Sequence, residues 1–153
     1  MRHLSPSFSG MAGIALLAAL TVSSTAHSED VRSGTVKSVQ GEVLVLRGES
    51  RQPVHSGDGV AARDRIVTGP SSAAALVLRD GTAITVGPNS TVDLTSFQFE
   101  PTRQEGGMVI GLIKGSIRFI TGFIGKHNPE SVRISTLTAT AGIRGTDFIL
   151  EVP

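Results

Sequence analysis

Short runs of β-branched and aliphatic residues, separated at close intervals by glycine, constrain the fold of this chain more than any other feature. Gly34, Gly41 and Gly48 bracket two such runs, and the turn sequences Asp80-Gly81 and Gly87-Pro88-Asn89 separate two more. Runs of this kind between turn dipeptides are typical of strands joined by tight turns. No capped helical pattern interrupts them, so we expect an all-β fold.

The alternation of apolar and polar residues assigns faces to several of these runs. Val92 and Leu94 point away from their polar neighbours, as do Val132 and Ile134, which predicts strands with one buried face. Residues 42–47 and 75–78 are apolar on both faces and predict strands covered on both sides. Short strands with Gly and Asp-Gly turns suit a twisted β-solenoid-like domain, a sandwich-like domain or a small barrel.

The segment from residue 107 to residue 125 has two interpretations. Its first three glycines lie four residues apart, a spacing found in packed membrane helices. Lys114 and Arg118 oppose that interpretation, because a cation near the centre of an inserted helix costs about 2.5–3.5 kcal/mol. We therefore expect two strands, Met108–Ile113 and Ser116–Thr121, joined at Lys114-Gly115, with a membrane helix as the alternative.

The N-terminus has the features of a secretory signal peptide. A weakly basic start precedes an apolar run at residues 11–22, and Ser24 and Ala26 occupy the small positions of a cleavage site. The apolar run is shorter than the roughly 20 residues that a membrane-spanning helix needs. We expect cleavage after residue 26, a single all-β domain at residues 27–153 and a periplasmic location. An uncleaved anchor and a buried helix are the alternatives.

Composition excludes several classes of function. Removing Arg2 with the signal peptide leaves 13 cationic and 13 anionic side chains, which argues against a nucleic-acid partner. The chain has no cysteine, so disulfides and thiolate metal sites are excluded. It also has no Trp or Tyr, the residues from which sugar-binding and base-stacking platforms are usually built.

No metal-binding or catalytic pattern emerges from the remaining polar residues. The histidines do not have paired ligand spacing, and the Asp58 loop lacks the order of calcium ligands. Asp80 and Asp147 are the carboxylates that a glycosidase-like enzyme would use, but both lie beside turn glycines, where aspartate usually binds local amides. We expect no enzymatic activity, no metal and no cofactor.

The stretch TATAGIRGTDFIL, residues 138–150, combines a cation, a carboxylate and two glycines. Gly142 and Gly145 predict a sharp turn or a close approach to another backbone segment. Thr146 and Asp147 would then bind exposed amides, and Arg144 would reach a carboxylate or carbonyls nearby. The alternative is an exposed Arg–Asp pair that contacts a partner.

The order of motifs resembles that of the FecR domain, an envelope module of Gram-negative bacteria. The likeness lies in GDGVAARDRIVTG, AALVLRDGTAITVGPNSTVDL, KGSIRFITG and TLTATAGIRGTDFIL, which together span about residues 57–150. The residues that match the family motifs are Gly57, Asp58, Asp64, Thr68, Gly69, Asp80, Gly81, Thr82, Pro88, Asn89, Arg144, Gly145, Thr146 and Asp147.

The resemblance implies a twisted, solenoid-like periplasmic domain without enzymatic activity. In the namesake iron-citrate regulator, such a domain receives a signal from an outer-membrane transporter and passes it to a cytoplasmic sigma factor. We expect this chain to lack the anti-sigma segment, the transmembrane helix and the transporter-contacting domain, and therefore the sigma-regulatory role. The expected function is interaction with another envelope protein, in envelope signalling if that role is retained. Binding of a small molecule or of peptidoglycan is the alternative.

Overall fold

The computed structural model describes residues 31–153, so the expected signal peptide lies outside the described residues. Strands make up most of the described chain, and the predicted all-β class is confirmed. In chain order the elements are β1 (Arg32–Gln40), β2 (Val43–Arg47), β3 (Ser50–Pro53), β4 (Gly59–Ala61), β5 (Arg65–Thr68), β6 (Ala73–Leu78), β7 (Ala83–Val86), β8 (Thr91–Glu100), β9 (Glu105–Ile120), α1 (Phe123–His127), the 3-10 helix η1 (Pro129–Ser131), β10 (Val132–Ser135), β11 (Thr140–Gly142) and β12 (Asp147–Val152).

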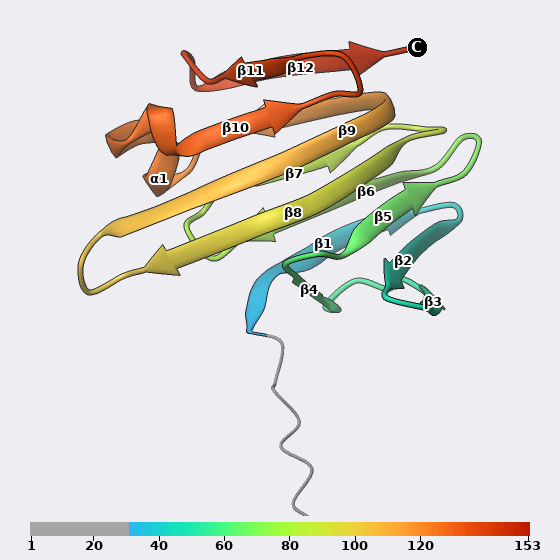
Figure 1. Ribbon diagram of the computed structural model, residues 1–153. Coiled ribbons are helices and arrows are strands. Elements are labelled where there is room, and N and C mark those ends of the chain that lie inside the picture. Colours follow the sequence, from blue (N-terminus) through green and yellow to red (C-terminus); the bar gives the residue numbers. More distant parts are fainter. Residues whose placement is uncertain (1–30) are drawn as a thin grey trace, which may run out of the picture.

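The strands form one strongly curled sheet that is antiparallel except where β10 lies parallel to β9 (Figure 1). Hydrogen-bonded neighbours follow the order β3-β2-β5-β8-β9-β7-β6-β1-β4. The last three strands lie off this path: β10 pairs with β9 and with β11, and β12 pairs with β9. The sheet therefore branches at β9, where its C-terminal strands attach.

The long strand β9 connects the two arms of the sheet. Its first half pairs with β8 and β10, and its second half pairs with β7 and β12. The change of partners falls at Gly115, whose φ of +86° is a conformation that glycine adopts readily. The expectation of two strands joined at Lys114-Gly115 is therefore wrong, because one left-handed residue bends the strand without ending it. No helix within residues 31–153 is long and apolar enough to cross a membrane.

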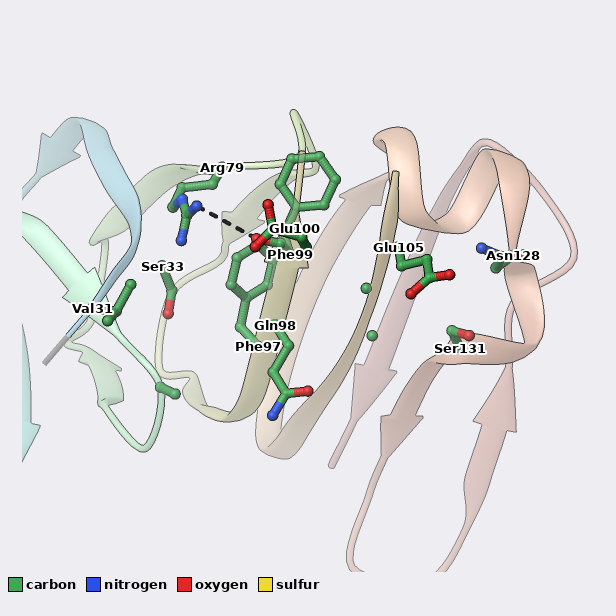
Figure 2. Close-up of a pocket in the computed structure, with 13 residues that line it drawn as sticks. Val31, Ser33, Arg79, Phe97, Gln98, Phe99, Glu100, Glu105, Asn128 and Ser131 are labelled. Atoms are coloured by element: carbon green, nitrogen blue, oxygen red, sulfur yellow. Dashed lines mark hydrogen bonds between the residues drawn. The ribbon is translucent and has the colours of Figure 1, made fainter. Parts of the chain in front are cut away.

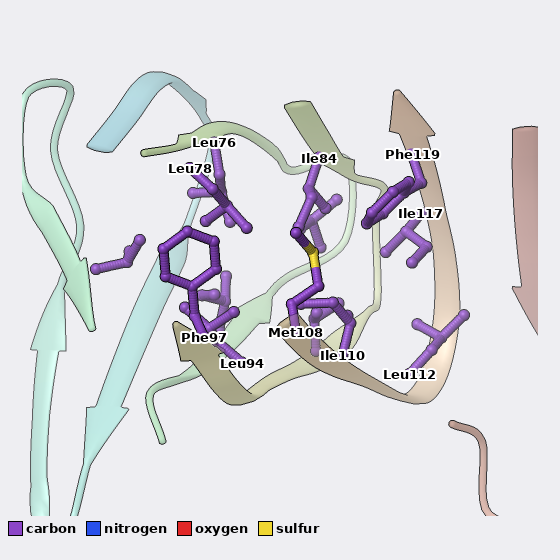
Figure 3. Close-up of a cluster of buried hydrophobic side chains, with 14 of the residues drawn as sticks. Leu76, Leu78, Ile84, Leu94, Phe97, Met108, Ile110, Leu112, Ile117 and Phe119 are labelled. Atoms are coloured by element: carbon purple, nitrogen blue, oxygen red, sulfur yellow. The ribbon is translucent and has the colours of Figure 1, made fainter. Parts of the chain in front are cut away.

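The hydrophobic core lies between the two arms. Ile84 and Phe119 come from the arm that contains β6, β7 and the second half of β9. Met108 and Ile110 come from the first half of β9 and point toward them from the opposite side (Figure 3). All four side chains are almost completely buried. The curl of the sheet therefore encloses a core that neither arm could form alone.

The predicted faces of the strands are confirmed where apolar and polar residues alternate. Val92 and Leu94 in β8 are buried, as are Val132 and Ile134 in β10. The prediction that residues 42–47 and 75–78 are covered on both sides is wrong, because alternate residues of β6 are only partly buried and Val43 is the only buried residue of β2. In β6 one face therefore points into the core and the other is only partly covered.

Two Gly-Pro-X-Ser turns, Gly69–Ser72 and Gly87–Ser90, brace neighbouring strands in the same way. In the first turn, the Gly69 amide donates to the Glu42 carbonyl at 3.0 Å and the Ser72 hydroxyl accepts from the Glu42 amide at 2.9 Å. In the second turn, Gly87 and Ser90 make the corresponding bonds to Ser116, each at 2.9 Å.

A left-handed glycine lies directly before each braced residue: Gly41 precedes Glu42 and Gly115 precedes Ser116. The hydroxyl of each turn serine also donates to the carbonyl of the turn proline, at 3.0 Å in both turns. The two turns are therefore an internal structural repeat that fixes two left-handed bends.

We expect Gly115→Ala to lower the free energy of unfolding by more than about 2 kcal/mol. The left-handed backbone alone costs about 1–2 kcal/mol for a residue with a Cβ, and that Cβ would lie 2.5 Å from the Cα of Ser90. Urea denaturation measures the change. Gly48→Ala is the matched control, because Gly48 has a φ of +58° and a Cβ added there would meet no atom within 4 Å. Equal losses in both variants would contradict the close-contact argument.

Candidate functional site

The opening and middle family motifs meet at the Gly87–Ser90 turn. The Thr68 hydroxyl donates to the Gly87 carbonyl at 2.6 Å and accepts from the Ser90 amide at 2.9 Å. The Asn89 amide donates to the Gly69 carbonyl at 3.0 Å. These motif residues therefore hold backbone segments together, and Thr68 is itself buried.

The Asp80-Gly81-Thr82 turn holds the segment that leads into α1. Asp80 accepts from the Thr82 amide and hydroxyl, at 3.0 and 2.8 Å, and from the Ile124 amide at 3.2 Å. The Thr82 hydroxyl accepts from the Gly122 amide at 3.2 Å. The Asp80 carboxylate is thus buried and accepts hydrogen bonds from Thr82 and from the start of α1, an arrangement suited to fixing a turn.

Asp64 is the most buried carboxylate in the described chain, with a fully covered side chain. It accepts two hydrogen bonds from the Arg47 guanidinium, both at 2.7 Å, and one from the Ala61 amide at 2.8 Å. Arg47 is half exposed, so the pair joins the buried end of β4 to the surface of β2. Asp58 lies in an exposed turn and accepts from the His55 amide at 2.7 Å.

The closing motif differs from its predicted geometry. A Cβ on Gly142 or Gly145 would meet no atom within 4 Å, and neither residue has a left-handed φ. The chain does bend at Gly145 and Thr146, but neither a close contact nor a left-handed φ requires glycine at position 142 or 145. The glycines here are tolerated in open space, so their presence says little about the local fold.

Thr121 braces the closing motif, although no sequence motif singled it out. Its buried hydroxyl donates to the Gly145 carbonyl at 2.8 Å, and its amide donates to the Thr146 carbonyl at 2.9 Å. Thr121 is the residue before the last glycine of the KGSIRFITG stretch, and that position is the signal that the sequence offered. Residues 121–124 therefore connect the middle motif to the closing motif.

Asp147 pairs with Arg118 of β9 and not with Arg144. The Arg118 guanidinium donates to both carboxylate oxygens, at 3.0 and 2.6 Å. These hydrogen bonds hold the pKa of Asp147 below its usual value, and the same bonds raise the pKa of Arg118. Arg144 is exposed and makes no hydrogen bond or ion pair within residues 31–153.

An apolar groove of about 750 Å³ lies beside this motif, between the β10–β11 hairpin and β12. Ile134, Ile143, Phe148 and Leu150 supply its apolar lining. The Phe148 ring stacks on the Phe119 ring of β9, with centroids 5.4 Å apart, which fixes one wall of the groove. Arg144 and the exposed Glu130 add charged side chains. The closing motif thus lines a concave apolar surface.

A larger cleft of about 1100 Å³ lies along the β8–β9 hairpin (Figure 2). Phe97, Phe99 and Arg79 line it, and Arg79 donates to the Phe99 carbonyl at 3.4 Å. Glu100 and Glu105 face each other across the hairpin end, where both are exposed. The lining of this cleft is thus a mixture of aromatic, cationic and anionic side chains.

A metal-binding role finds no support within residues 31–153. No group of three or more His, Cys, Asp or Glu side chains there is arranged to hold a metal ion. The ring of His127 stacks on Phe123 with centroids 3.9 Å apart, and its Nδ1 contacts the Phe123 carbonyl at 2.9 Å. The groove beside β12 is therefore our candidate functional site.

Comparison with known protein families supports the resemblance. The family model described as FecR protein matches residues 64–152. The matched range includes Asp64, the middle motif and the closing motif, and leaves Gly57 and Asp58 outside. Neither the curated proteins nor the solved structures that were searched include a match to this chain.

We expect Asp64→Asn to lower the free energy of unfolding by about 2–4 kcal/mol, because the amide group would place a donor against donors from Arg47 and Ala61. Asp93→Asn is the matched control. It removes a carboxylate from the more exposed Arg65–Asp93 pair, in which the guanidinium also donates twice, at 2.6 and 2.8 Å. Exposed pairs contribute about 0–1 kcal/mol. Urea denaturation compares the two variants, and similar small losses would contradict the role given to Asp64.

The stabilities of a Thr121 variant and a Gly145 variant can be compared in the same way. We expect Thr121→Val to cost about 1 kcal/mol, because the Gly145 carbonyl loses its hydroxyl donor. Gly145→Ala should change stability by less than about 0.5 kcal/mol, as is usual for an exposed site without close neighbours. Thermal and urea unfolding of the two variants measure the difference. A larger loss for Gly145→Ala would show that the bend at Gly145 requires glycine.

Proposed function

The chain belongs to the FecR protein family, and we propose that it acts as a non-catalytic interaction module that binds another protein of the cell envelope. The family is associated with envelope signalling. One observation carries the proposal: most of the buried motif residues brace the backbone, while the closing motif leaves an apolar groove and an exposed strand beside it. An arrangement of this kind suits protein recognition better than chemistry.

The hydrogen bonds of three aspartates support a non-catalytic role. Asp64 and Asp80 each accept three hydrogen bonds from their own surroundings. Asp147, which with Asp80 would form the hypothetical catalytic pair, accepts hydrogen bonds from Nε and Nη2 of Arg118. A general acid or base needs a carboxyl group that is free to exchange a proton with a substrate. These three residues are better suited to structural roles.

The proposal includes export and removal of residues 1–26, so that the mature module begins at His27 in the periplasm. The apolar run and the small residues at 24 and 26 support it. Envelope signalling is the setting that the family suggests, and we include no sigma-factor contact. Binding of a small molecule or of peptidoglycan stays the alternative, although the lack of Trp and Tyr counts against a sugar platform.

Cross-linking in intact cells tests the proposal. The full chain, with an affinity tag inserted in the exposed turn between Pro101 and Gln104, is produced in the bacterium that encodes it and cross-linked in the periplasm. We expect one or a few envelope proteins to be recovered above a tagged, unrelated periplasmic control and to bind the purified module directly. Gly115→Ala serves as a destabilised control.

Two results would count against this function. Recovery of no specific protein, in repeated experiments in which the tagged module is exported and folded, would contradict it. Co-sedimentation of the purified module with peptidoglycan, in the absence of any protein partner, would favour the glycan alternative.

A further inference from the structure

The outer edge of β12 is an open strand edge. β12 pairs with β9, and no other strand within residues 31–153 pairs with it. All six of its residues are at least partly exposed. An unpaired edge presents a row of main-chain donors and acceptors that another extended chain can bind.

The register shows which main-chain groups are available. The Thr121 amide donates to the Thr146 carbonyl, and the β12–β9 register continues from Asp147 opposite Ile120. In an antiparallel ladder, alternate residues direct both their amide and their carbonyl to the same neighbour. Phe148 and Leu150 therefore bind β9, whereas Asp147, Ile149 and Glu151 direct their main-chain groups toward the open edge.

The side chains of β12 divide in the same alternation. Phe148 and Leu150 line the apolar groove on the inner face, and Ile149 and Glu151 lie on the exposed outer face. Asp147, at the start of the strand, is exposed and also borders the groove. A strand added to this edge would place every second side chain beside the groove. The groove would then select apolar side chains at those positions.

Exposed hydrophobic side chains gather around the same strand. Four large hydrophobic residues are exposed within residues 31–153, and Ile149, at 71%, is one of them. Ile120 is the cross-strand neighbour of Asp147, and Leu137 lies in the turn of the hairpin that flanks the groove. Three of the four therefore lie on β12 or on the elements that flank it, as expected at an interaction surface.

Charge argues for a different protein as the occupant, and against a second copy of this chain. Antiparallel pairing of two β12 strands in full overlap would place Asp147 opposite Glu151 of the other copy, and like charges directly opposite each other are destabilising. Glu151 and Arg144 are exposed, lie near opposite ends of the edge and have no ion pair within the described residues. They suit a guest with one cationic end and one anionic end.

We propose that the β12 edge and its groove bind an extended segment of a partner protein by antiparallel strand addition. The segment has apolar side chains at alternate positions, a basic side chain near its N-terminal end opposite Glu151, and an acidic side chain near its C-terminal end beside Arg144. This inference rests on the proposed function, because it names the surface and the class of partner that the interaction module uses.

A designed peptide tests the surface without knowledge of the natural partner. The probe is acetyl-Lys-Val-Thr-Val-Thr-Val-Thr-Glu-amide with a fluorophore, titrated with the purified module at low salt. We expect saturable binding, and at least a tenfold loss when the first threonine of the peptide, which would lie opposite Ile149, is replaced by proline, which removes a main-chain donor to the β12 edge. No binding, or equal binding of the proline peptide, overturns the proposal.

Protein variants distinguish strand addition from nonspecific hydrophobic binding of the peptide. Ile149→Pro removes an amide that points to the open edge and leaves the donors to β9 in place, so we expect a folded protein without peptide binding. Because proline could still disturb folding, a second variant reverses two exposed charges, Arg144→Glu with Glu151→Lys. It should weaken the probe about tenfold and bind the peptide with its terminal Lys and Glu exchanged about as tightly as the wild type binds the probe. Failure of that exchange overturns the proposed orientation and charge recognition.

The same variants keep this inference distinct from the proposed function. If wild type and Ile149→Pro recover the same envelope protein equally well, the interaction function stands and the β12 surface is wrong. If the wild type recovers no protein in cells, the function fails even where the peptide binds. A concentration-dependent dimer of the wild type that Ile149→Pro abolishes would assign the edge to a second copy and overturn the choice of partner.

Discussion

The left-handed bend at Gly115 is the feature on which the rest of the structure depends. It allows one strand, β9, to pair with β8 and β10 before the bend and with β7 and β12 after it. The core forms because these two halves carry Met108 and Ile110 on one side and Phe119 on the other. Without the bend, β9 would pair with the strands of one arm only. The side chains of that arm would then have no facing side chains to pack against in the core.

Serine and threonine hydroxyls stabilise the bends and turns in a chain that has no cysteine. Ser72 and Ser90 each fix the residue after a left-handed glycine, Thr82 fixes the start of α1, and Thr121 fixes the closing motif. Each hydroxyl satisfies main-chain groups that a turn leaves without a ladder partner. The bracing explains how a small domain of short strands keeps its curvature without disulfides.

Local pattern is enough to predict the all-β class, the inward positions of β8 and β10, and the family. Local pattern does not predict features that depend on residues far away in the sequence. The glycine spacing in β9 indicates a break, but whether the chain turns back or only bends is decided by Ser90, 25 residues earlier. The local sequence assigns Asp147 to its own turn, whereas register places Arg118 beside it. The two Gly-Pro-X-Ser turns show their equivalence only through hydrogen bonds to residues far along the chain.

An exposed strand edge with apolar side chains carries a risk of aggregation, and natural proteins usually protect such edges with charge. In β12 the protection is partial: Asp147 and Glu151 flank Ile149, and neither blocks the main-chain groups that face outward. Two acidic side chains on one strand oppose full-overlap pairing between copies of this chain, yet Glu151 admits a guest with a basic side chain opposite it. The same residues that limit self-association therefore favour a specific partner, a combination expected of a surface that is kept open for binding.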